Sequence, residues 1–454
     1  MEGLILSVSG ARGIVGRGLD PLVFAEMAAH FGAWLPGPGP VVVGRDSRVS
    51  GEMAMAAVTA GLLGVGRRVV QLGIVATPTV EIAVRELRAA GGVQISASHN
   101  PAEWNALKLL SSRGIFLTAE EGARFRARLD SGRPSFRPWD GLGEVERRDD
   151  LAAIHVERIL ASPLVDAAAI RARGFRVIVD CVHGAGGAIA ALLLERLGVR
   201  AEFVAFEPTG RFPRDPEPRP ENLGALGDAV RRTAADVGFA LDPDADRVAV
   251  VDESGRPVGE EVTLAVVVDS VLPRVGGDVV VNVSTTMAME EVAARHGGKV
   301  LRTPVGEVHV TERMLATGAK IGGEGNGGVI VPDVNPGRDG LLGIALWLDA
   351  LARRGEAASR LAARIPVTVM RKEKIEVGSA DVDRVLRDLE AGYPGARVDR
   401  TDGLKLLVAD GWVHVRRSNT EPILRLLAEA RSEGSVDGLV RQARRIVEGA
   451  TAAR

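Results

Sequence analysis

Three aspartates stand at a spacing of two residues in one short segment of the sequence. Asp242, Asp244 and Asp246 lie between two apolar stretches, and Arg247 follows directly. Carboxylates that converge on one loop can bind a hard divalent cation through oxygen, with room left for a phosphate oxygen. A solvated acidic turn is the alternative, but the apolar flanks favour a cation, because three mutually repelling carboxylates need compensating charge. An EF-hand is excluded, since Arg247 replaces the glycine of its loop and the flanks predict strands.

A serine and a histidine follow an apolar stretch that ends at Ile95. Ser98 and His99 fall in the loop expected there, and α/β sheets bind ligands at the carboxyl ends of their strands. A hydroxyl in such a place can carry a phosphoryl group. The alternative is an N-cap serine before a helix begun by Pro101. Lys108 follows as the first of only six lysines in the chain, which favours a proton donor or phosphate partner over a surface charge.

Two further segments and one arginine offer groups that can bind a phosphorylated sugar. After an expected strand near the C-terminus come Arg416, Ser418, Asn419 and Thr420, whose donors suit a phosphate dianion, although a structural turn is the alternative. The segment 322–328 is rich in glycine, and its polar side chains can hydrogen-bond sugar hydroxyls, with a plain glycine hairpin as the alternative. The polar residues of that segment are Glu324 and Asn326.

Arg12 lies in a Ser-Gly-Ala-Arg-Gly segment near the N-terminus. A guanidinium held between glycines can act as an electrostatic clamp on a phosphoryl group during its transfer.

The elements that must position these residues follow a repeated pattern. Alternating strand and helix signals predict an α/β domain over residues 1–150, and the pattern restarts over 151–253 and again over 254–365. Residues 366–454 predict a smaller α+β domain. We expect three consecutive α/β domains with mixed sheets and a C-terminal α+β domain, with loops from all four facing one central cleft.

Composition limits the classes of function that remain. The 454 residues include 57 basic and 59 acidic side chains, so the formal charge of −2 speaks against a nucleic-acid partner. No apolar run is long enough to span a membrane, and no signal-type segment opens the sequence, so a cytoplasmic protein is expected. The single cysteine, Cys181, excludes an intrachain disulfide and a zinc site built on several cysteines.

In this order the motifs resemble those of the α-D-phosphohexomutase family, which comprises phosphoglucomutases, phosphomannomutases and phosphoglucosamine mutases. The resemblance spans the chain. It matches a phosphoserine loop at 97–101, a metal loop at 242–247, a sugar loop at 323–327 and a phosphate loop at 416–420. The implied catalytic residues are Ser98, Lys108, Arg12, His99 and Arg247. The implied Mg²⁺ ligands are Ser98, Asp242, Asp244 and Asp246. The implied sugar-binding residues are Glu324 and Asn326, and the implied phosphate-binding residues are Arg416, Ser418, Asn419 and Thr420.

The resemblance implies an intramolecular phosphotransferase, an isomerase that interconverts hexose 6-phosphate and hexose 1-phosphate. The phosphoryl group would pass through Ser98 and a hexose 1,6-bisphosphate, which would also act as activator. The sugar loop, with the Arg-Asp-Gly that starts at Arg338, looks like that of archaeal-type phosphoglucosamine mutases, which favours glucosamine 6-phosphate as substrate. Mannose or glucose phosphates, or a silent phosphosugar-binding protein, are the alternatives, and a monomer or a homodimer is expected. His183 stands where relatives usually have asparagine.

Overall fold

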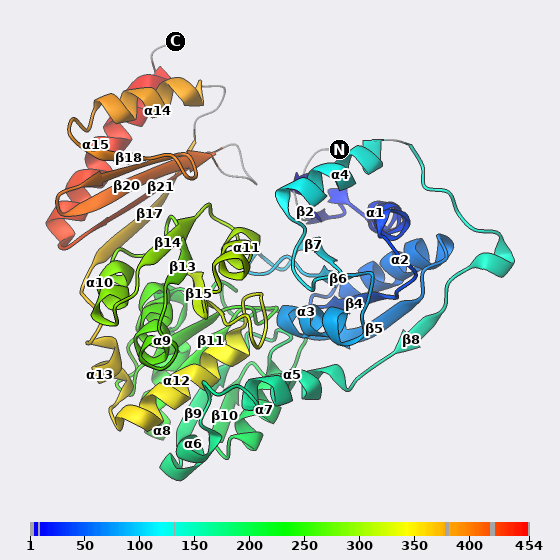
Figure 1. Cartoon of the computed structure of the whole chain (residues 1–454), viewed down its shortest axis with the longest axis horizontal. Helices are drawn as coiled ribbons and strands as arrows, with labels where there is room; N and C mark the ends of the chain where they lie inside the picture. The colour runs from blue at the N-terminus through cyan, green and yellow to red at the C-terminus, as the bar shows by residue number, and fades with distance from the viewer. Residues whose placement is uncertain (1–3, 8–9, 131, 377–380, 418–422, 453–454) are drawn as a thin grey trace.

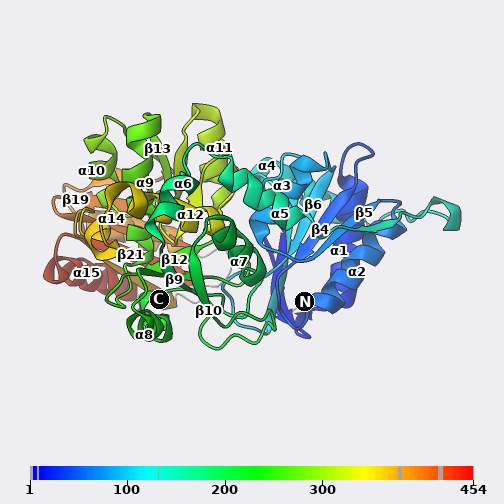
Figure 2. The same cartoon turned by 90° about the horizontal axis from the view of Figure 1, so that it is seen from below.

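Four β-sheets follow one another along the chain, each in a domain of its own. The computed structural model describes residues 4–7, 10–130, 132–376, 381–417 and 423–452. Figure 1 and Figure 2 place the first and the fourth domain at opposite ends of the molecule, with the second and third domains between them. The prediction of three α/β domains followed by an α+β domain is confirmed.

The first domain has an eight-stranded mixed sheet in the order β1-β2-β7-β6-β4-β5-β8, with β3 paired to β2. Its strands are β1 (Leu4–Ser7), β2 (Gly10–Val15), β3 (Gly18–Leu19), β4 (Val41–Arg45), β5 (Val69–Ile74), β6 (Gly91–Ile95), β7 (Trp104–Ser111) and β8 (Val145–Arg147). Its helices are α1 (Pro21–Trp34), α2 (Gly51–Gly64), α3 (Thr77–Glu86), α4 (Ala119–Asp130) and the 3₁₀ turn η1 (Trp139–Gly141).

Strand β4 shows why this sheet is covered on both faces. Its valines alternate between two hydrophobic clusters, because successive side chains of a strand point to opposite faces. Val41 and Val43 pack in the cluster of α1 and α2, whereas Val42 packs in the cluster of α3. A central parallel strand buried on both faces therefore requires the continuous apolar run that the sequence has here.

The second and third domains each have a four-stranded sheet, in the orders β10-β9-β11-β12 and β14-β13-β15-β16. The second contains α5 (Leu151–Leu160), α6 (Ala167–Arg173), β9 (Arg176–Asp180), α7 (Gly187–Arg196), β10 (Arg200–Val204), η2 (Pro220–Asn222), α8 (Gly224–Thr233), β11 (Val237–Leu241) and β12 (Val248–Val251). The third contains α9 (Glu260–Val275), β13 (Val279–Asn282), α10 (Ala288–Arg295), β14 (Val300–Thr303), α11 (Glu307–Thr317), β15 (Ile321–Glu324), β16 (Gly328–Ile330), α12 (Gly340–Arg354) and α13 (Ala358–Ala362).

One strand arrangement recurs in the first three domains. Three parallel strands are followed by an antiparallel one in β5-β4-β6-β7, in β10-β9-β11-β12 and in β14-β13-β15-β16. The hairpin between the last two strands holds the phosphoserine loop in the first domain, the metal loop in the second and the sugar loop in the third. Each loop therefore begins at the carboxyl end of a parallel strand, the edge at which α/β sheets bind ligands.

The second and third domains share one hydrophobic core. Helix α12 is buried over residues 340–351 and packs against both α9 and α6. Its Trp347 is fully buried, and the indole Nε1 donates to the Thr263 carbonyl at 3.0 Å. Because the same cluster includes Val177 of β9 and Val279 of β13, the two domains pack as one body.

We expect Trp347→Ala to lower the free energy of unfolding by about 3 to 5 kcal/mol, because it removes a large buried side chain from the shared core. Urea unfolding followed by circular dichroism would measure the loss. The matched control is Trp139→Ala, since Trp139 on η1 is 87% exposed and should change the free energy by less than about 0.5 kcal/mol. Equal effects of the two substitutions would contradict the shared-core interpretation.

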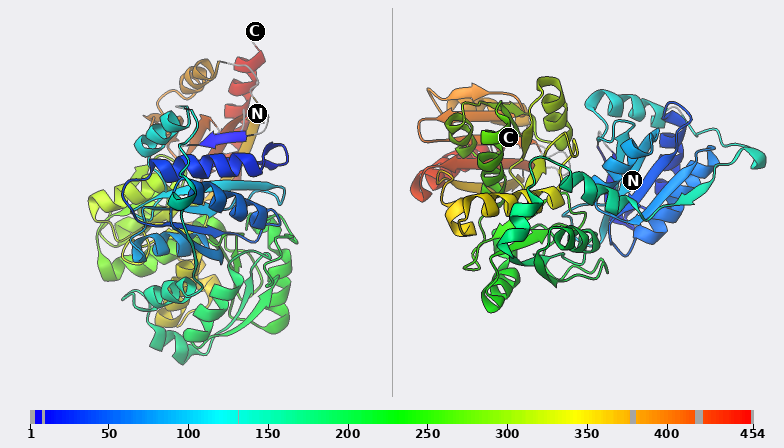
Figure 3. Two further views of the ribbon diagram at one scale, coloured as in Figure 1. Left: turned by 90° about the vertical axis from the view of Figure 1, so that its right-hand side faces the viewer. Right: turned by 60° about the horizontal axis from the view of Figure 1, so that its bottom comes forward.

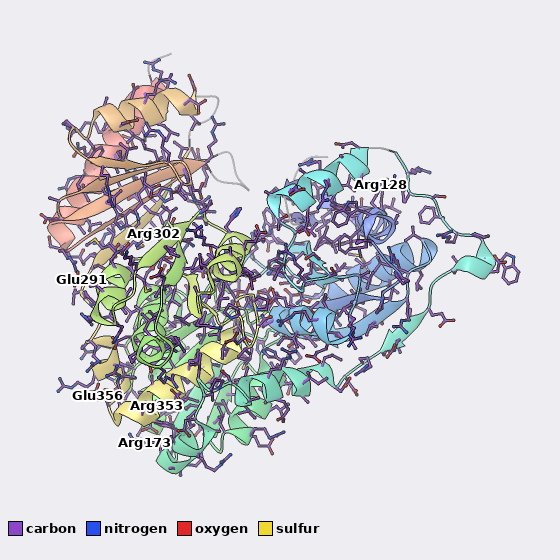
Figure 4. The ribbon with its side chains drawn as sticks, viewed as in Figure 1. Arg128, Arg173, Glu291, Arg302, Arg353 and Glu356 are labelled. Atoms are coloured by element: carbon purple, nitrogen blue, oxygen red, sulfur yellow. The ribbon has the colours of Figure 1, made fainter. Side chains whose placement is uncertain are left out.

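The fourth domain has an antiparallel sheet in the order β17-β21-β20-β19-β18, and α14 and α15 pack together against it. Its elements are β17 (Val369–Glu376), α14 (Val382–Ala391), β18 (Arg397–Asp399), β19 (Leu404–Val408), β20 (Gly411–Arg417), β21 (Ile423–Ala430) and α15 (Glu433–Ala452). It contacts the third domain (Figure 3) through Lys405, whose Nζ donates to the Val283 carbonyl at 2.6 Å. Arg431 pairs with Glu291 of α10, which is labelled in Figure 4.

None of the helices in the described ranges combines the length and the apolar character needed to cross a lipid bilayer.

Candidate active site

The metal loop connects β11 to β12 and buries its three aspartates. Asp242, Asp244 and Asp246 are each 0% exposed, and their ligand oxygens lie within 4.8 Å of one another. Ala245 adopts a left-handed φ of +54° in this tight turn, which brings the alternate carboxylates to one side. The interpretation as a solvated acidic turn is therefore wrong.

Two of these carboxylates have one oxygen hydrogen-bonded to a cation and the other without a hydrogen-bond donor among the described residues. Lys108 Nζ and Thr77 Oγ1 both donate to Asp244 Oδ2 at 2.5 Å, and Arg338 Nη2 donates to Asp246 Oδ2 at 2.6 Å. The buried Oδ1 atoms of Asp244 and Asp246 accept no hydrogen bond from the described residues. An unpartnered buried oxygen is costly, and clustered carboxylate oxygens are the ligands that Mg²⁺ prefers. The donor set fits this ion.

The charges in the metal loop interact strongly. Burial, together with Asp246 and Asp244, raises the pKa of Asp242 well above its usual range. Burial alone would also raise the pKa of Asp244, but the Lys108 ammonium brings it below the usual range. Burial would lower the pKa of Lys108, yet Asp244 and Asp246 raise it, so this side chain stays charged at neutral pH. A divalent cation would offset the remaining repulsion among the carboxylates.

Ser98 lies against the metal loop although 144 positions separate it from Asp242. The Ser98 hydroxyl donates to Asp242 Oδ2 at 3.0 Å, and His99 Nδ1 lies 3.4 Å from the same Oγ. Ser98 has a φ of +51°, a conformation that non-glycine residues adopt rarely and that is enriched at functional sites. The loop leads into strand β7 instead of a helix, so the N-cap interpretation is wrong.

A buried arginine that the sequence motifs did not reveal holds the phosphoserine loop in place. Arg48 is 1% exposed, and its Nη2 donates to the carbonyls of Ser98 and Asn100 at 2.6 and 2.7 Å. Its Nε pairs with Asp46 Oδ2 at 3.0 Å, and the same oxygen accepts from Ser96 Oγ at 2.7 Å. The segment that holds Asp46 and Arg48 follows β4, the neighbour of β6, and this adjacency was the signal that could have identified it.

Arg12 and Arg247 add positive charge around Ser98. Arg12 Nη1 donates to Asn100 Oδ1 at 2.9 Å, and Arg247 Nε lies 3.6 Å from Asp246 Oδ1 as an ion pair. Burial and the Arg247 charge lower the pKa of Arg12 to about 10. Burial and the same two arginines hold the pKa of His99 well below its usual range, so its imidazole is neutral at pH 7. Such a surrounding favours a phosphate dianion.

Glu324 ends β15 and is 2% exposed. Its Oε1 accepts from Asn282 Nδ2 at 2.7 Å and from the Gly306 amide at 3.1 Å, and its Oε2 accepts from Arg338 Nη1 at 2.7 Å. The hairpin glycine Gly327 has a φ of +86°, and a Cβ there would lie 2.3 Å from the Val248 carbonyl oxygen. The segment is thus a glycine hairpin that packs on β12, the strand that follows the metal loop. The same hairpin carries Glu324.

A cavity of about 330 Å³ between the third and fourth domains brings Glu324, Asn326 and Arg416 together. Burial lowers the pKa of Arg416, whose Nη1 lies 3.9 Å from Asp402 Oδ2. Ser98 and the three aspartates do not line this cavity. The predicted phosphate-loop residues that lie outside the described part of the chain are Ser418, Asn419 and Thr420.

The candidate residues therefore form two groups, one around Ser98 and one around Glu324 and Arg416. A larger cavity of about 550 Å³ lies where the third and fourth domains join, near Lys372 and Glu429, and its lining contains no predicted site residue. The side chain that connects the two groups is Arg338, which bonds both Asp246 and Glu324. The sequence motifs gave this arginine no role.

Comparison with known proteins identifies similar sequences along the chain. The family models described as phosphoglucomutase/phosphomannomutase, alpha/beta/alpha domains I, II and III match residues 4–134, 153–255 and 260–368, and the C-terminal domain model matches 365–446. The Thermococcus kodakarensis "Phosphoglucomutase/phosphomannomutase" is 39% identical over 438 residues, 95% of each chain. The Methanopyrus kandleri "Probable phosphoglucosamine mutase" is 39% identical over 435 residues, also 95% of each. A crystal structure of a Burkholderia thailandensis phosphoglucomutase/phosphomannomutase family protein has a TM-score of 0.86 at 28% identity, covering 99% of this chain and 98% of that one.

Proposed function

The chain belongs to the phosphoglucomutase/phosphomannomutase family, and we propose that it interconverts hexose 6-phosphates and hexose 1-phosphates through a phosphorylated Ser98. The observation that carries this proposal is the hydrogen bond from Ser98 Oγ to Asp242 Oδ2 at 3.0 Å. It sets the Ser98 hydroxyl beside a cluster of buried carboxylates that fits Mg²⁺.

In the proposed transfer, the bond between phosphorus and Ser98 Oγ breaks while a new bond forms to the free hydroxyl of the sugar. The proton of that hydroxyl must leave, and Ser98 Oγ must gain one. The neutral His99 can accept the first proton, and the charged Lys108 can donate the second. Arg12 and Arg247 stabilise the equatorial oxygens. Asp242, Asp244 and Asp246 would hold Mg²⁺ together with Ser98. The bound ion would supply positive charge that offsets the negative charge of the phosphoryl group.

A mutase must also hold the phosphate that is not being transferred. The bisphosphate has to turn end for end so that its second phosphoryl group reaches Ser98. This requires residues away from the serine that hold the sugar, the sugar grip, and residues that hold the other phosphate, the phosphate grip. Glu324 can accept hydrogen bonds from sugar hydroxyls, Asn326 can accept or donate them, and Arg416 shares their cavity. We assign Ser418, Asn419 and Thr420 to the same phosphate grip on the motif alone.

Glucosamine 6-phosphate is the first substrate that we propose. The form of the sugar loop and the Methanopyrus kandleri relative's name support it. The second candidate is mannose or glucose 6-phosphate, which the name of the equally similar Thermococcus kodakarensis relative supports. Because these sugars differ only in the substituent or the configuration at C2, the choice depends on the contacts that the sugar loop makes at that ring position.

The test is ³¹P NMR of the purified protein with Mg²⁺ and a trace of hexose 1,6-bisphosphate, incubated separately with the 6-phosphates of glucosamine, mannose and glucose. A growing 1-phosphate resonance is the expected result, and the relative rates identify the preferred sugar. A folded protein with phosphorylated Ser98 that converts none of the three would contradict the proposed function and favour a phosphosugar-binding protein.

Arg416→Ala is expected to raise the KM for the hexose phosphate about tenfold or more and to change kcat less, because a charge-assisted phosphate contact is lost from the cavity. Steady-state kinetics measure both constants. The neighbouring Arg417→Ala is the control, since Arg417 is exposed and pairs with Asp383, and its KM should match the wild type. An unchanged KM in Arg416→Ala would remove this residue from the phosphate grip.

A further inference from the structure

One guanidinium holds three carboxylates from different elements. Arg338 is 8% exposed, and its Nη2 and Nη1 donate to Asp246 Oδ2 at 2.6 Å and to Glu324 Oε2 at 2.7 Å. Its Nε lies 3.1 Å from Oε2 of Glu307, the first residue of α11. The metal loop of the second domain and the sugar loop of the third are thus joined through a single side chain.

The backbone around Arg338 is fixed from both sides. The Arg338 amide donates to Glu307 Oε1 at 3.1 Å, and the next residue, Asp339, caps α12 through its Oδ1. A Cβ on Gly328 would lie 2.2 Å from the Arg338 Cδ, so the glycine of the sugar loop's strand leaves room for the arginine stem. The Gly340 amide donates to the Ala245 carbonyl at 3.1 Å, which seats the start of α12 on the metal loop.

The contacts of Arg338 decide which oxygens remain for ligands. On Asp246 they occupy Oδ2 and leave the buried Oδ1 without a hydrogen bond. On Glu324, Oε1 already accepts from two donors, whereas Oε2 accepts from Arg338 alone among the described residues. A carboxylate oxygen has two lone pairs, so one acceptor position on Glu324 Oε2 stays available for a hydroxyl. The same guanidinium thereby orients one oxygen for a cation and one for a sugar.

We propose that Arg338 is a positioning residue that couples the metal loop to the sugar loop by fixing Asp246 and Glu324 with the two arms of its guanidinium. This proposal rests on the proposed function, in which the metal loop binds Mg²⁺ and the sugar loop binds hexose phosphate. A planar fork can bond two carboxylates at once, which an ammonium group on a flexible stem does not reproduce.

Without this fork, Asp246 would keep its longer ion pairs with Lys108 and Arg247, and Glu324 would keep its hydrogen bonds from Asn282 and the Gly306 amide, but both would lose their shortest contact with a cation. Removal of one partner from a buried ion pair leaves an uncompensated charge, and the free carboxylates would rotate or bind a proton. Loss of a group that orients a metal ligand typically costs about 10 to 100-fold in metal affinity. If the Glu324 carboxylate loses its orientation, the binding of hexose phosphate should weaken as well.

The experiment measures two affinities separately in Arg338→Met and Arg338→Lys. Mn²⁺ binding to the metal-free protein is followed by electron paramagnetic resonance, and binding of the three hexose 6-phosphates without metal is followed by calorimetry. We expect about a tenfold or greater loss in both affinities for Arg338→Met. Arg338→Lys is expected to lose at least one of the two, since its single ammonium group can pair with one carboxylate only.

The matched controls are Arg274→Met and Arg274→Lys. Arg274 pairs with buried Asp349 at 3.0 Å and donates to the Leu164 carbonyl, so its loss disturbs a buried ion pair outside the site. Both affinities should stay within twofold of the wild type there. Arg338 variants that match this behaviour, with only the melting temperature lowered, would show a purely structural role and overturn the proposal.

Loss of a single affinity in Arg338→Met would overturn the coupling and assign Arg338 to that loop alone. If Arg338→Met does not fold, the decision falls to Arg338→Lys, in which two unchanged affinities refute the proposal. Failure of the proposed function has another signature, because the wild-type protein would then convert none of the three hexose phosphates in the ³¹P NMR test. If the wild-type protein also bound none of them, the coupling would be refuted as well, while the Mn²⁺ titration would still report whether Arg338 orients Asp246.

Discussion

Ser98→Ala is expected to abolish the interconversion of hexose phosphates, with a loss of about 10⁴-fold or more, as removal of a covalent nucleophile does in other enzymes. The substitution removes the oxygen that would carry the phosphoryl group and that donates to Asp242. Two other hydroxyls near the site among the described residues are already engaged, that of Ser96 with Asp46 and that of Thr77 with Asp244. The measurement combines ³¹P NMR of the sugar with mass spectrometry of the peptide that contains residue 98.

The control for this variant is Ser111→Ala. Ser111 is also a buried serine of the first domain, but it ends β7 and its hydroxyl donates to the Ile115 carbonyl, away from the metal loop. Its activity should stay within a few-fold of the wild type, and both variants should show the wild-type circular dichroism spectrum. Turnover by Ser98→Ala at the wild-type rate, or a phosphorylated peptide without this serine, would exclude Ser98 as the phosphoryl carrier.

The sequence predicted the residues of the site better than the contacts that hold them. The motifs located Ser98 and the three aspartates because their loops follow directly on a strand-like apolar run. That strand is also the element that positions them. Thr77 and Arg338 were missed for the opposite reason. Thr77 bonds Asp244 across 167 positions, and Arg338 bonds Asp246 across 92. Only the packing of separate domains creates such pairs, and no local pattern marks them.

The fold shows the same division between local and long-range information. The continuous apolar runs of β4 and of the segment before the metal loop predicted their strands, since burial on both faces dictates that pattern. The shared core of the second and third domains was not predicted, because the sequence shows α12 only as an apolar helix and cannot say that its far side packs on α6. The exact domain boundaries and the roles of the site residues stay predictions.

Asp244→Asn is the second change with a large expected effect, because it removes a buried carboxylate that two donors contact. Asp244 Oδ2 accepts from Lys108 and Thr77, and its buried Oδ1 has no hydrogen-bond donor among the described residues. An amide keeps the shape but loses the charge that attracts a cation. We expect Mn²⁺ affinity to fall about 100-fold or more and kcat to fall about 10² to 10³-fold. Paramagnetic resonance and steady-state kinetics measure the two losses.

Asp252→Asn is the control, because it makes the same exchange outside the metal loop. It shows whether the loss of one aspartate charge by itself lowers metal affinity and activity. Asp252 follows β12 and bonds only its own turn, through Ser254 and the Arg256 amide. Its substitution therefore costs turn stability and should leave both Mn²⁺ affinity and kcat near the wild type. If Asp244→Asn were as active as this control, and as active in EDTA as in Mg²⁺, the buried carboxylates would not be a metal site. Lys108, Arg247 and Arg338 would then have to balance the carboxylates, and the transfer would have to proceed without a metal ion.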